Sequence, residues 1–127
     1  MRRIVPVALA GLLALVVAGS ALAASYTYSD HFFTSNRTFV TTNAAGDLSV
    51  SATFATKTAS TYDVAIAEYP SGYACLSTIT GSSGTVGCAI VAAPAATYAI
   101  WFWNVNGYSG SGGPTKVTVT VTGNLVP

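Results

Sequence analysis

The stretch that decides the fold class is Val117–Thr122, VTVTVT, in which apolar and polar side chains alternate without interruption. A period of two places every valine on one face of an extended strand and every threonine on the other. Leu48–Phe54, LSVSATF, repeats the pattern with larger apolar side chains. The two stretches therefore predict strands with one face in a core and one face in water.

The remainder of residues 24–127 also has the pattern of strands separated by turns. It contains no apolar stripe of helical period, and its seventeen threonines favour strands. The further strands that the sequence predicts are Tyr26–Tyr28, Arg37–Thr42, Thr61–Tyr69, Leu76–Ile79, Thr85–Ala92 and Thr97–Val105. About seven to nine antiparallel strands cannot bury their apolar faces in one sheet, so we expect an all-β, two-sheet β-sandwich of jelly-roll or immunoglobulin-like type.

The first 23 residues have the composition of an export signal. Two arginines near the start precede an uncharged apolar run over 4–19, and Ala21 and Ala23 supply an A-x-A cleavage pattern. The apolar run of about 16 residues is shorter than the ~20 that cross a bilayer, which disfavours a retained membrane anchor. We therefore predict a signal peptide over 1–23, secretion to the extracellular space, and a single domain over 24–127.

The charge of the chain excludes several classes of partner. Five Lys and Arg against four Asp and Glu give a formal net charge of +1. Without the two arginines of the predicted signal, three cations remain against four anions, so 3 − 4 = −1. Because three scattered cations do not form a phosphate-binding patch, we predict no nucleic-acid partner, and no membrane association after signal cleavage.

Cys75 and Cys88 are the only cysteines, and in an oxidising compartment an even pair predicts a disulfide. If Gly81 and Ser82 are the central residues of a type II′ hairpin turn, residues 75 and 88 face each other in a non-hydrogen-bonded pair. A longer loop centred on Ser83 would offset them. A zinc site built on the cysteines would need two more ligands, and the chain has one histidine.

Three stretches resemble the bacterial pre-peptidase C-terminal (PPC) domain. They are Ala45–Val50, Tyr62–Ile66 with the turn Pro70–Gly72, and Pro94–Ile100. The resemblance implies a secreted β-sandwich of jelly-roll type; some members bind calcium, and several related sandwiches bind polysaccharide or collagen. Ala96 stands where the family has a glycine, and the family's acidic pairing is reduced to Asp63. We therefore predict no metal and no other cofactor.

No combination of residues predicts catalysis. His31 is the only histidine, and Asp30 beside it in a strand would point to the opposite face. Asp63 and Glu68 are five residues apart, so in a regular strand they also face opposite sides and do not make a glycosidase pair. We therefore predict that the protein is not an enzyme.

Trp101 and Trp103 are the candidate ligand-binding residues. They share one face of a predicted strand, about 6.8 Å apart at ~3.4 Å per residue, while Ile100 and Phe102 suit the core. If exposed, the two tryptophans form an aromatic platform for sugar rings or for a partner protein. The candidates for additional polar contacts are Tyr108, Asn104 and Asn106. The alternative is a central strand with both faces covered, in which the tryptophans belong to the core.

Three functions are open on the sequence alone. The first is a secreted, non-catalytic module that binds glycan or cell-surface material through the face of Trp101 and Trp103. The second is a structural or self-associating extracellular protein that uses the same face, or an exposed strand edge, against another copy. The third is a small secreted inhibitor that presents the loop around Tyr108 to a target enzyme.

Overall fold

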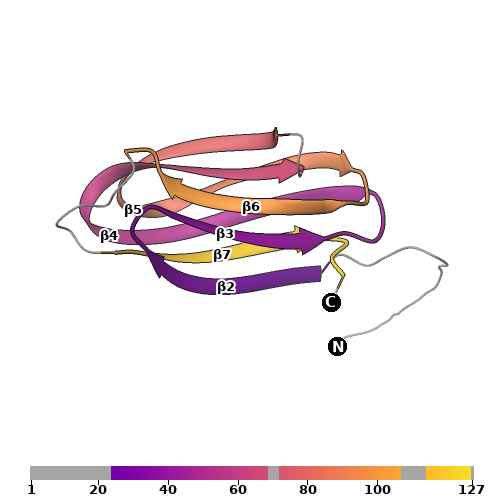
Figure 1. Ribbon diagram of the computed structural model, residues 1–127, viewed down its shortest axis with the longest axis horizontal. Coiled ribbons are helices and arrows are strands. Elements are labelled where there is room, and N and C mark those ends of the chain that lie inside the picture. The colour runs from indigo at the N-terminus through magenta and orange to yellow at the C-terminus, as the bar shows by residue number, and fades with distance from the viewer. Residues whose placement is uncertain (1–23, 69–71, 107–113, 127) are drawn as a thin grey trace, which may run out of the picture.

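A computed structural model of the chain describes residues 24–68, 72–106 and 114–126. Within these ranges the protein is all-β, with six strands that pair antiparallel and no helix (Figure 1). It follows that no helix of the described part is able to cross a membrane. The predicted signal peptide over 1–23 lies outside the described residues.

All six strands belong to one hydrogen-bonded sheet. They are β2 (Ala24–Phe32), β3 (Ser35–Thr41), β4 (Gly46–Glu68), β5 (Gly72–Ala93), β6 (Thr97–Asn104) and β7 (Thr115–Gly123). The order is β2-β7-β4-β6-β3, and β5 pairs with the other edge of β4. The strands run along the long axis of the molecule, and both ends of the described chain lie at the same end of it (Figure 1).

Strand β4, with 23 residues, organises the sheet because its two halves have different neighbours. Residues 49–55 pair with β7, whereas residues 62–68 pair with β6. Along the opposite edge β5 pairs with both halves, and the register shifts between Ala55 and Ser60. The β4–β5 ribbon bends there (Figure 1). The half that carries β7 and β2 thereby folds over the half that carries β6 and β3.

The predicted pair of separate sheets is not confirmed, because the bent ribbon keeps both halves in one sheet. The strand count of the described residues is also lower than predicted. Strand β4 covers two predicted strands, 48–54 and 61–69, and ends one residue before the end of the second of them. Strand β5 covers the two predicted strands 76–79 and 85–92. Both strands remain continuous through the bend. Gly81 and Gly84 accommodate the bend in β5, with φ values of 155° and 153° that side-chain-bearing residues rarely adopt.

The disulfide between Cys75 and Cys88 is present, in a setting that differs from the predicted hairpin. Both cysteines belong to β5, opposite Ile66 and Val50 of β4 rather than opposite each other. Their Cα atoms are 6.0 Å apart although 13 positions separate them, because β5 folds over together with β4. The disulfide therefore joins the two halves of the folded ribbon, and the glycine-rich stretch between the cysteines is the bend.

One hydrophobic core fills the space between the two halves of the sheet. As the alternation predicts, its members are every second residue of the strands, among them Leu48, Val50, Ala52, Phe54, Val64, Ile66, Ile100, Val117, Val119 and Val121. The rings of Tyr62 and Phe102 stack at 5.3 Å, and Phe54 lies 4.7 Å from Tyr62. Burying one such side chain stabilises the fold by about 1.5–3 kcal/mol.

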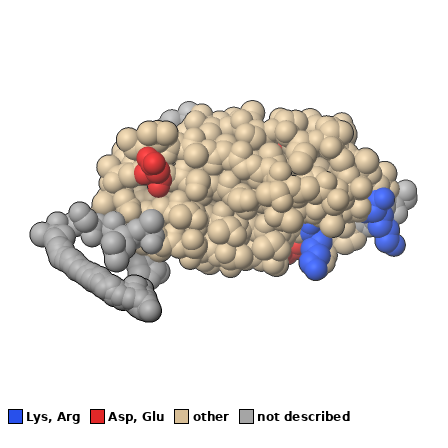
Figure 2. Space-filling model, turned by 180° about the vertical axis from the view of Figure 1, so that it is seen from behind, with Lys and Arg blue, Asp and Glu red and all other residues tan. Residues whose placement is uncertain are grey.

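The outer face of the half formed by β2, β7 and β4 is covered by short hydroxyl side chains. Cross-strand hydroxyl pairs connect β2 to β7 at 3.1, 3.0 and 2.9 Å: Ser25–Thr122, Thr27–Thr120 and Ser29–Thr118. Figure 2 shows one face of the molecule on which charged side chains are few and set apart. Hydroxyl side chains therefore cover much of the solvent-facing surface, where other proteins carry charged side chains.

Strands β2 and β3 stand at the two ends of the strand order, and they approach each other near the two residues that connect them. The Tyr28 hydroxyl donates to Asn36 Oδ1 at 2.8 Å, and Asn36 Nδ2 donates to Asp30 Oδ2 at 2.7 Å. Burial, with Tyr26 and Asp30 nearby, raises the pKa of the Tyr28 hydroxyl, which keeps it a donor. The sheet is thus nearly closed at this end.

Candidate functional site

Trp101 and Trp103 lie on the outer face of β6, where both side chains are half-buried. The residues that alternate with them, Ile100 and Phe102, are in the core. Strand β6 is central, between β4 and β3, but its tryptophan face is not fully covered. The two indole rings are perpendicular, with centroids 6.3 Å apart. They therefore present one ring face and one ring edge, which is not a flat platform.

Neighbouring strands bring further rings and one cation to the tryptophans. Tyr73 of β5 stacks on Trp103 with centroids 5.8 Å apart and planes at 19°. Arg37 of β3 pairs with Trp101 in register, and its Cζ lies 4.7 Å from the centroid of that ring and 5.2 Å from that of Phe39. We call the surface formed by these side chains the aromatic face; its residues are Arg37, Phe39, Tyr73, Trp101 and Trp103.

Alanines form the floor between these larger side chains. Ala65 and Ala67 of β4 and Ala99 of β6 are buried, and they lie in register with residues of the aromatic face or with one another. Their short side chains leave a hollow of about 230 Å³ beside Trp101. The residues that line this first hollow are Arg37, Ala67, Glu68, Gly72, Tyr73, Ala99 and Trp101.

A second hollow of about 200 Å³ lies next to the first. Its lining residues are Glu68, Gly72, Tyr73, Ala74, Ile90, Pro94 and Tyr98. Glu68, Gly72 and Tyr73 line both hollows, and Tyr73, which is 61% exposed, forms the wall that they share. Burial, together with the carboxylate of Glu68, raises the pKa of Tyr98, whose hydroxyl donates to the carbonyl oxygen of Pro94.

Of the polar candidates from the sequence, Asn104 and Asn106 do not join this face. Asn104 is 2% exposed on the core face of β6, because its position has the opposite parity to Trp101 and Trp103. Its Oδ1 accepts from Ser60 Oγ at 3.0 Å and from the backbone N–H of Asn106 at 2.9 Å. Asn106 is exposed and its Nδ2 donates to the same Ser60 oxygen at 3.2 Å. Tyr108 lies outside the described residues.

Four residues of the site were not identified from the sequence. Arg37, Phe39, Glu68 and Tyr73 each stand in or beside a predicted strand, where nothing distinguishes them from ordinary surface positions. Only the register of β3, β4 and β5 against β6 brings them to Trp101. Sequence parity could have placed Arg37 on one strand face, but not on this face of the molecule.

The acidic residues and the histidine are not grouped around one point. His31 is exposed on β2, and its backbone N–H donates to Asp30 Oδ1 at 2.8 Å. Asp63 accepts a hydrogen bond from the hydroxyl of Thr78. Asp63 and Glu68 both belong to β4 and are five positions apart. Five positions span about 17 Å of strand, more than the ~9.5 Å limit of a glycosidase carboxylate pair. Among the described residues, no three His, Cys, Asp or Glu lie together as metal ligands would.

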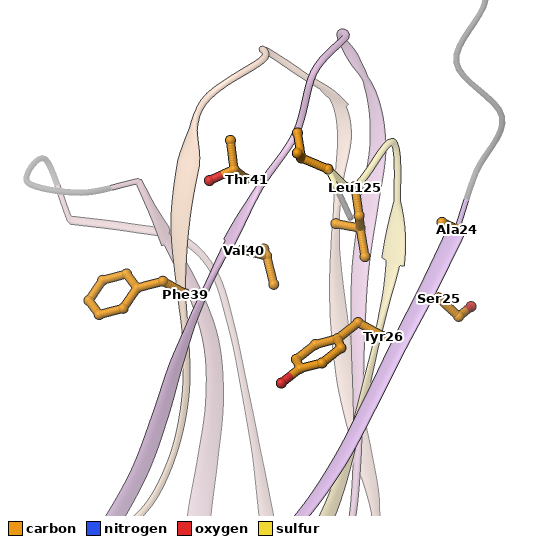
Figure 3. Close-up of a pocket in the computed structure, with 8 residues that line it drawn as sticks. Ala24, Ser25, Tyr26, Phe39, Val40, Thr41 and Leu125 are labelled. Carbon is orange, nitrogen blue, oxygen red and sulfur yellow. The ribbon is translucent and has the colours of Figure 1, made fainter.

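A third cavity, the edge groove, lies between β2 and β3 where these two strands diverge. It has a volume of about 510 Å³, and its lining is uncharged: Ala24, Ser25, Tyr26, Phe39, Val40, Thr41, Leu125 and Val126. Tyr26 and Val40 point into the space from opposite strands, whereas Phe39 points away from it (Figure 3). The backbone N–H of Val126 donates to the carbonyl oxygen of Thr41 at 2.8 Å and closes one end of the groove.

Comparison with known proteins identifies no family for this chain. No family model matches the sequence, and no curated protein matches it.

Several solved structures have a partly similar arrangement of strands. A CBM4 carbohydrate-binding module has a TM-score of 0.44 and 10% identity over 72% of this chain and 58% of its own length. A periplasmic inhibitor of g-type lysozyme from Aeromonas hydrophila has a TM-score of 0.44 and 13% identity, with 83% and 89% covered. Disulfide-linked pili of Bacillus endospores have a TM-score of 0.45 and 11% identity, with 85% and 93% covered. At these values the similarities assign neither a family nor a function.

Proposed function

We propose that the protein is a secreted, non-catalytic module that binds glycan through the aromatic face. The observation that carries the proposal is the first hollow, where half-exposed Trp101 and exposed Tyr73 stand above a floor of alanines. Sugar rings have an apolar face of C–H groups, and an aromatic ring matches that face in size and polarity. A concave, largely apolar site with a few polar groups is typical of small-ligand recognition.

Arg37 and Glu68 supply the polar groups of the first hollow. A guanidinium donates to hydroxyl and ring oxygens, and a carboxylate accepts from hydroxyl groups, so a ligand rich in hydroxyls suits both. A flat apolar partner would leave both charges desolvated without hydrogen bonds, which is costly. The combination of charges and rings favours a sugar over a lipid or an apolar peptide.

The finer features of the fold and its location belong to the same proposal. The two halves of the folded sheet enclose one core, as the two layers of a β-sandwich of jelly-roll or immunoglobulin-like type do. The resemblance to PPC domains agrees with such a module. The disulfide supports an oxidising compartment, and therefore export by the predicted signal peptide.

The test is retention of the domain 24–127 on insoluble polysaccharides, with Trp101→Ala as the disrupting variant. Since tryptophans at the centre of a binding site carry much of the affinity, retention should fall about tenfold or more. Tyr26→Ala is the matched control, because Tyr26 is an exposed aromatic residue that lies in the edge groove. Equal retention of both variants and the wild-type domain, or no retention by any polysaccharide, would refute the proposal.

A second candidate function, self-association, is favoured by the edge groove. In the part of the chain that the structure describes, strands β2 and β3 each pair along one edge only. The groove, whose described lining residues are uncharged, lies between their unpaired edges. Unpaired strand edges next to apolar surface are templates for pairing with another chain. We propose a strand of a second copy as the occupant.

Sedimentation velocity tests this second candidate. The wild-type domain should form dimers or larger species as its concentration rises, and Ser25→Lys should keep it monomeric, because a charge on an edge strand opposes pairing. Ser51→Lys is the control, since Ser51 is exposed on the outer face of the central strand β4. A wild-type domain that remains monomeric at every concentration would contradict self-association.

A further inference from the structure

We propose, on the basis of the proposed glycan binding, that the two hollows beside Tyr73 are consecutive subsites for a glycan that alternates acidic and neutral rings. The first hollow takes the ring that bears the carboxylate or sulfate, and the second takes the neutral ring. Glu68, Gly72 and Tyr73 line both hollows, so a ligand that fills one reaches the other directly across Tyr73.

The size of the hollows indicates one ring in each. Their volumes, about 230 and 200 Å³, are both below the ~300–1,000 Å³ of sites for drug-sized ligands. A longer ligand therefore has to pass over Tyr73 into the neighbouring hollow. Tyr73 is held in place for this role because its ring stacks on Trp103. The pair of hollows thus favours a chain over a single sugar.

Arg37 distinguishes the first hollow from the second. Its Cζ lies over the rings of Trp101 and Phe39, 4.7 and 5.2 Å from their centroids. The two rings pack against the planar group, which lines the first hollow. A planar guanidinium held in this way is preorganised for two parallel hydrogen bonds to a carboxylate or sulfate.

The second hollow has the opposite preference. Among the described residues that line it, Glu68 is the only charged one, and its other walls come from Ile90, Pro94 and the aromatic ring of Tyr98. An anionic ring there would be repelled by the carboxylate of Glu68, with no cation to compensate. The hydroxyl groups of a neutral ring would instead donate to that carboxylate. The two neighbouring hollows therefore select rings of different charge.

A cationic ligand is disfavoured although Trp101, Tyr73 and Glu68 together have the composition of a cation-binding cage. Aromatic rings bind ammonium groups when a ring face is open to the cation. Here Arg37 already lies over the ring of Trp101 and would repel a second positive charge in the same small hollow. This leaves the anionic group as the charged part of the ligand.

The test is a titration of the domain with three oligosaccharides of equal length, followed by tryptophan fluorescence and calorimetry. A hyaluronan hexasaccharide alternates uronate and neutral rings, an oligogalacturonate is acidic throughout, and cellohexaose is neutral throughout. The hyaluronan probe should bind most tightly, and free glucuronate should bind more weakly than the hexasaccharide. Arg37→Gln should weaken hyaluronan binding by roughly tenfold or more, because a hydrogen bond to a charged group is lost.

Two further variants sharpen the test. Arg37→Gln should weaken cellohexaose binding much less than hyaluronan binding, because cellohexaose has no anionic group to pair with the guanidinium. Glu68→Gln should improve binding of the oligogalacturonate, because the repulsion in the second hollow is removed. Lys57→Gln is the control for the loss of one positive charge, since Lys57 is exposed at the bend of β4 and lines neither hollow.

The outcomes separate the inference from the proposed function. Tighter binding of cellohexaose, no effect of Arg37→Gln, or binding of none of the three probes would overturn the charge assignment. The proposed function would survive those results if polysaccharide still retained the wild-type domain and not the Trp101→Ala variant. It would fall if the Trp101→Ala and Tyr26→Ala variants were retained as well as the wild-type domain, or if no polysaccharide retained the domain.

Discussion

At the scale of single residues, the parity of a position on β6 decides what its side chain does. Phe102 and Asn104 point into the molecule, whereas Trp101 and Trp103 point outward. The sequence predicts this alternation for the tryptophans and Phe102, and the same rule applied to Asn104 would have placed it inside. A local period of two is therefore enough to assign faces, because it depends only on the extended backbone.

We predict different costs for two adjacent substitutions on β6. Phe102→Ala should lower the free energy of unfolding by about 3–5 kcal/mol, because it removes a ring from the centre of the core. Trp101→Ala should cost clearly less, since the side chain is half-exposed and its loss removes one cation–π contact of about 0.5–1 kcal/mol. Urea unfolding of both variants measures the two values, and equal losses would contradict the assignment of faces.

A second residue-scale prediction concerns alkaline pH. Tyr28 and Tyr98 both have pKa values raised above the ordinary value of 10.0, with burial as the first cause. Above pH 10 the unfolded chain releases these protons while the folded chain keeps them, so stability falls as pH rises. Stability should therefore be constant from pH 8 to about 9 and decline above 10.

The Tyr28→Phe variant tests the origin of this decline. It should be less stable at neutral pH because Asn36 loses a hydrogen-bond donor, but its stability should fall less steeply above pH 10. Urea midpoints measured at pH 8, 10 and 11 give the slopes. A Tyr28→Phe slope equal to that of the wild-type domain would show that burial of Tyr28 is not the cause.

At the scale of elements, the long strands β4 and β5 separate what sequence can predict from what it cannot. Their alternating segments are recognisable, because alternation is local. The bend between residues 55 and 60 is not, since it follows from which strand pairs with each half of β4. The same long-range register brings Arg37 and Tyr73 to the tryptophans. The sequence therefore predicts the two tryptophans of the candidate site, but not the residues that pack against them.

The disulfide provides the prediction at this scale. Replacing Cys75 and Cys88 by serine should lower the free energy of unfolding by about 3 kcal/mol, the chain-entropy value for a loop of this length. Amide hydrogen exchange should then accelerate in β5 more than in β7, because the disulfide joins the two halves of β5. Ser77→Ala is a control for a side-chain change on the same strand face that leaves the disulfide intact. Uniform acceleration across the sheet would argue against this local role.

At the scale of the whole molecule, one core and one sheet make the described part a single unit. Every strand contributes at least one residue to the same buried cluster. Such a structure should unfold in one cooperative step, with coincident transitions in tryptophan fluorescence and far-ultraviolet circular dichroism. Two separated transitions in urea would indicate instead that the two halves of the folded ribbon unfold independently.

The pairing of β2 with β7 has a consequence for the timing of folding. Ser25 lies opposite Thr122, so the first strand finds its partner only at the far end of the chain. Such distant contacts slow the search for the native state, and the sheet cannot be completed before β7 has been synthesised. A chain that passes through a secretion channel would therefore lack its complete sheet until β7 had emerged. It would become resistant to proteases only after its last strand had crossed.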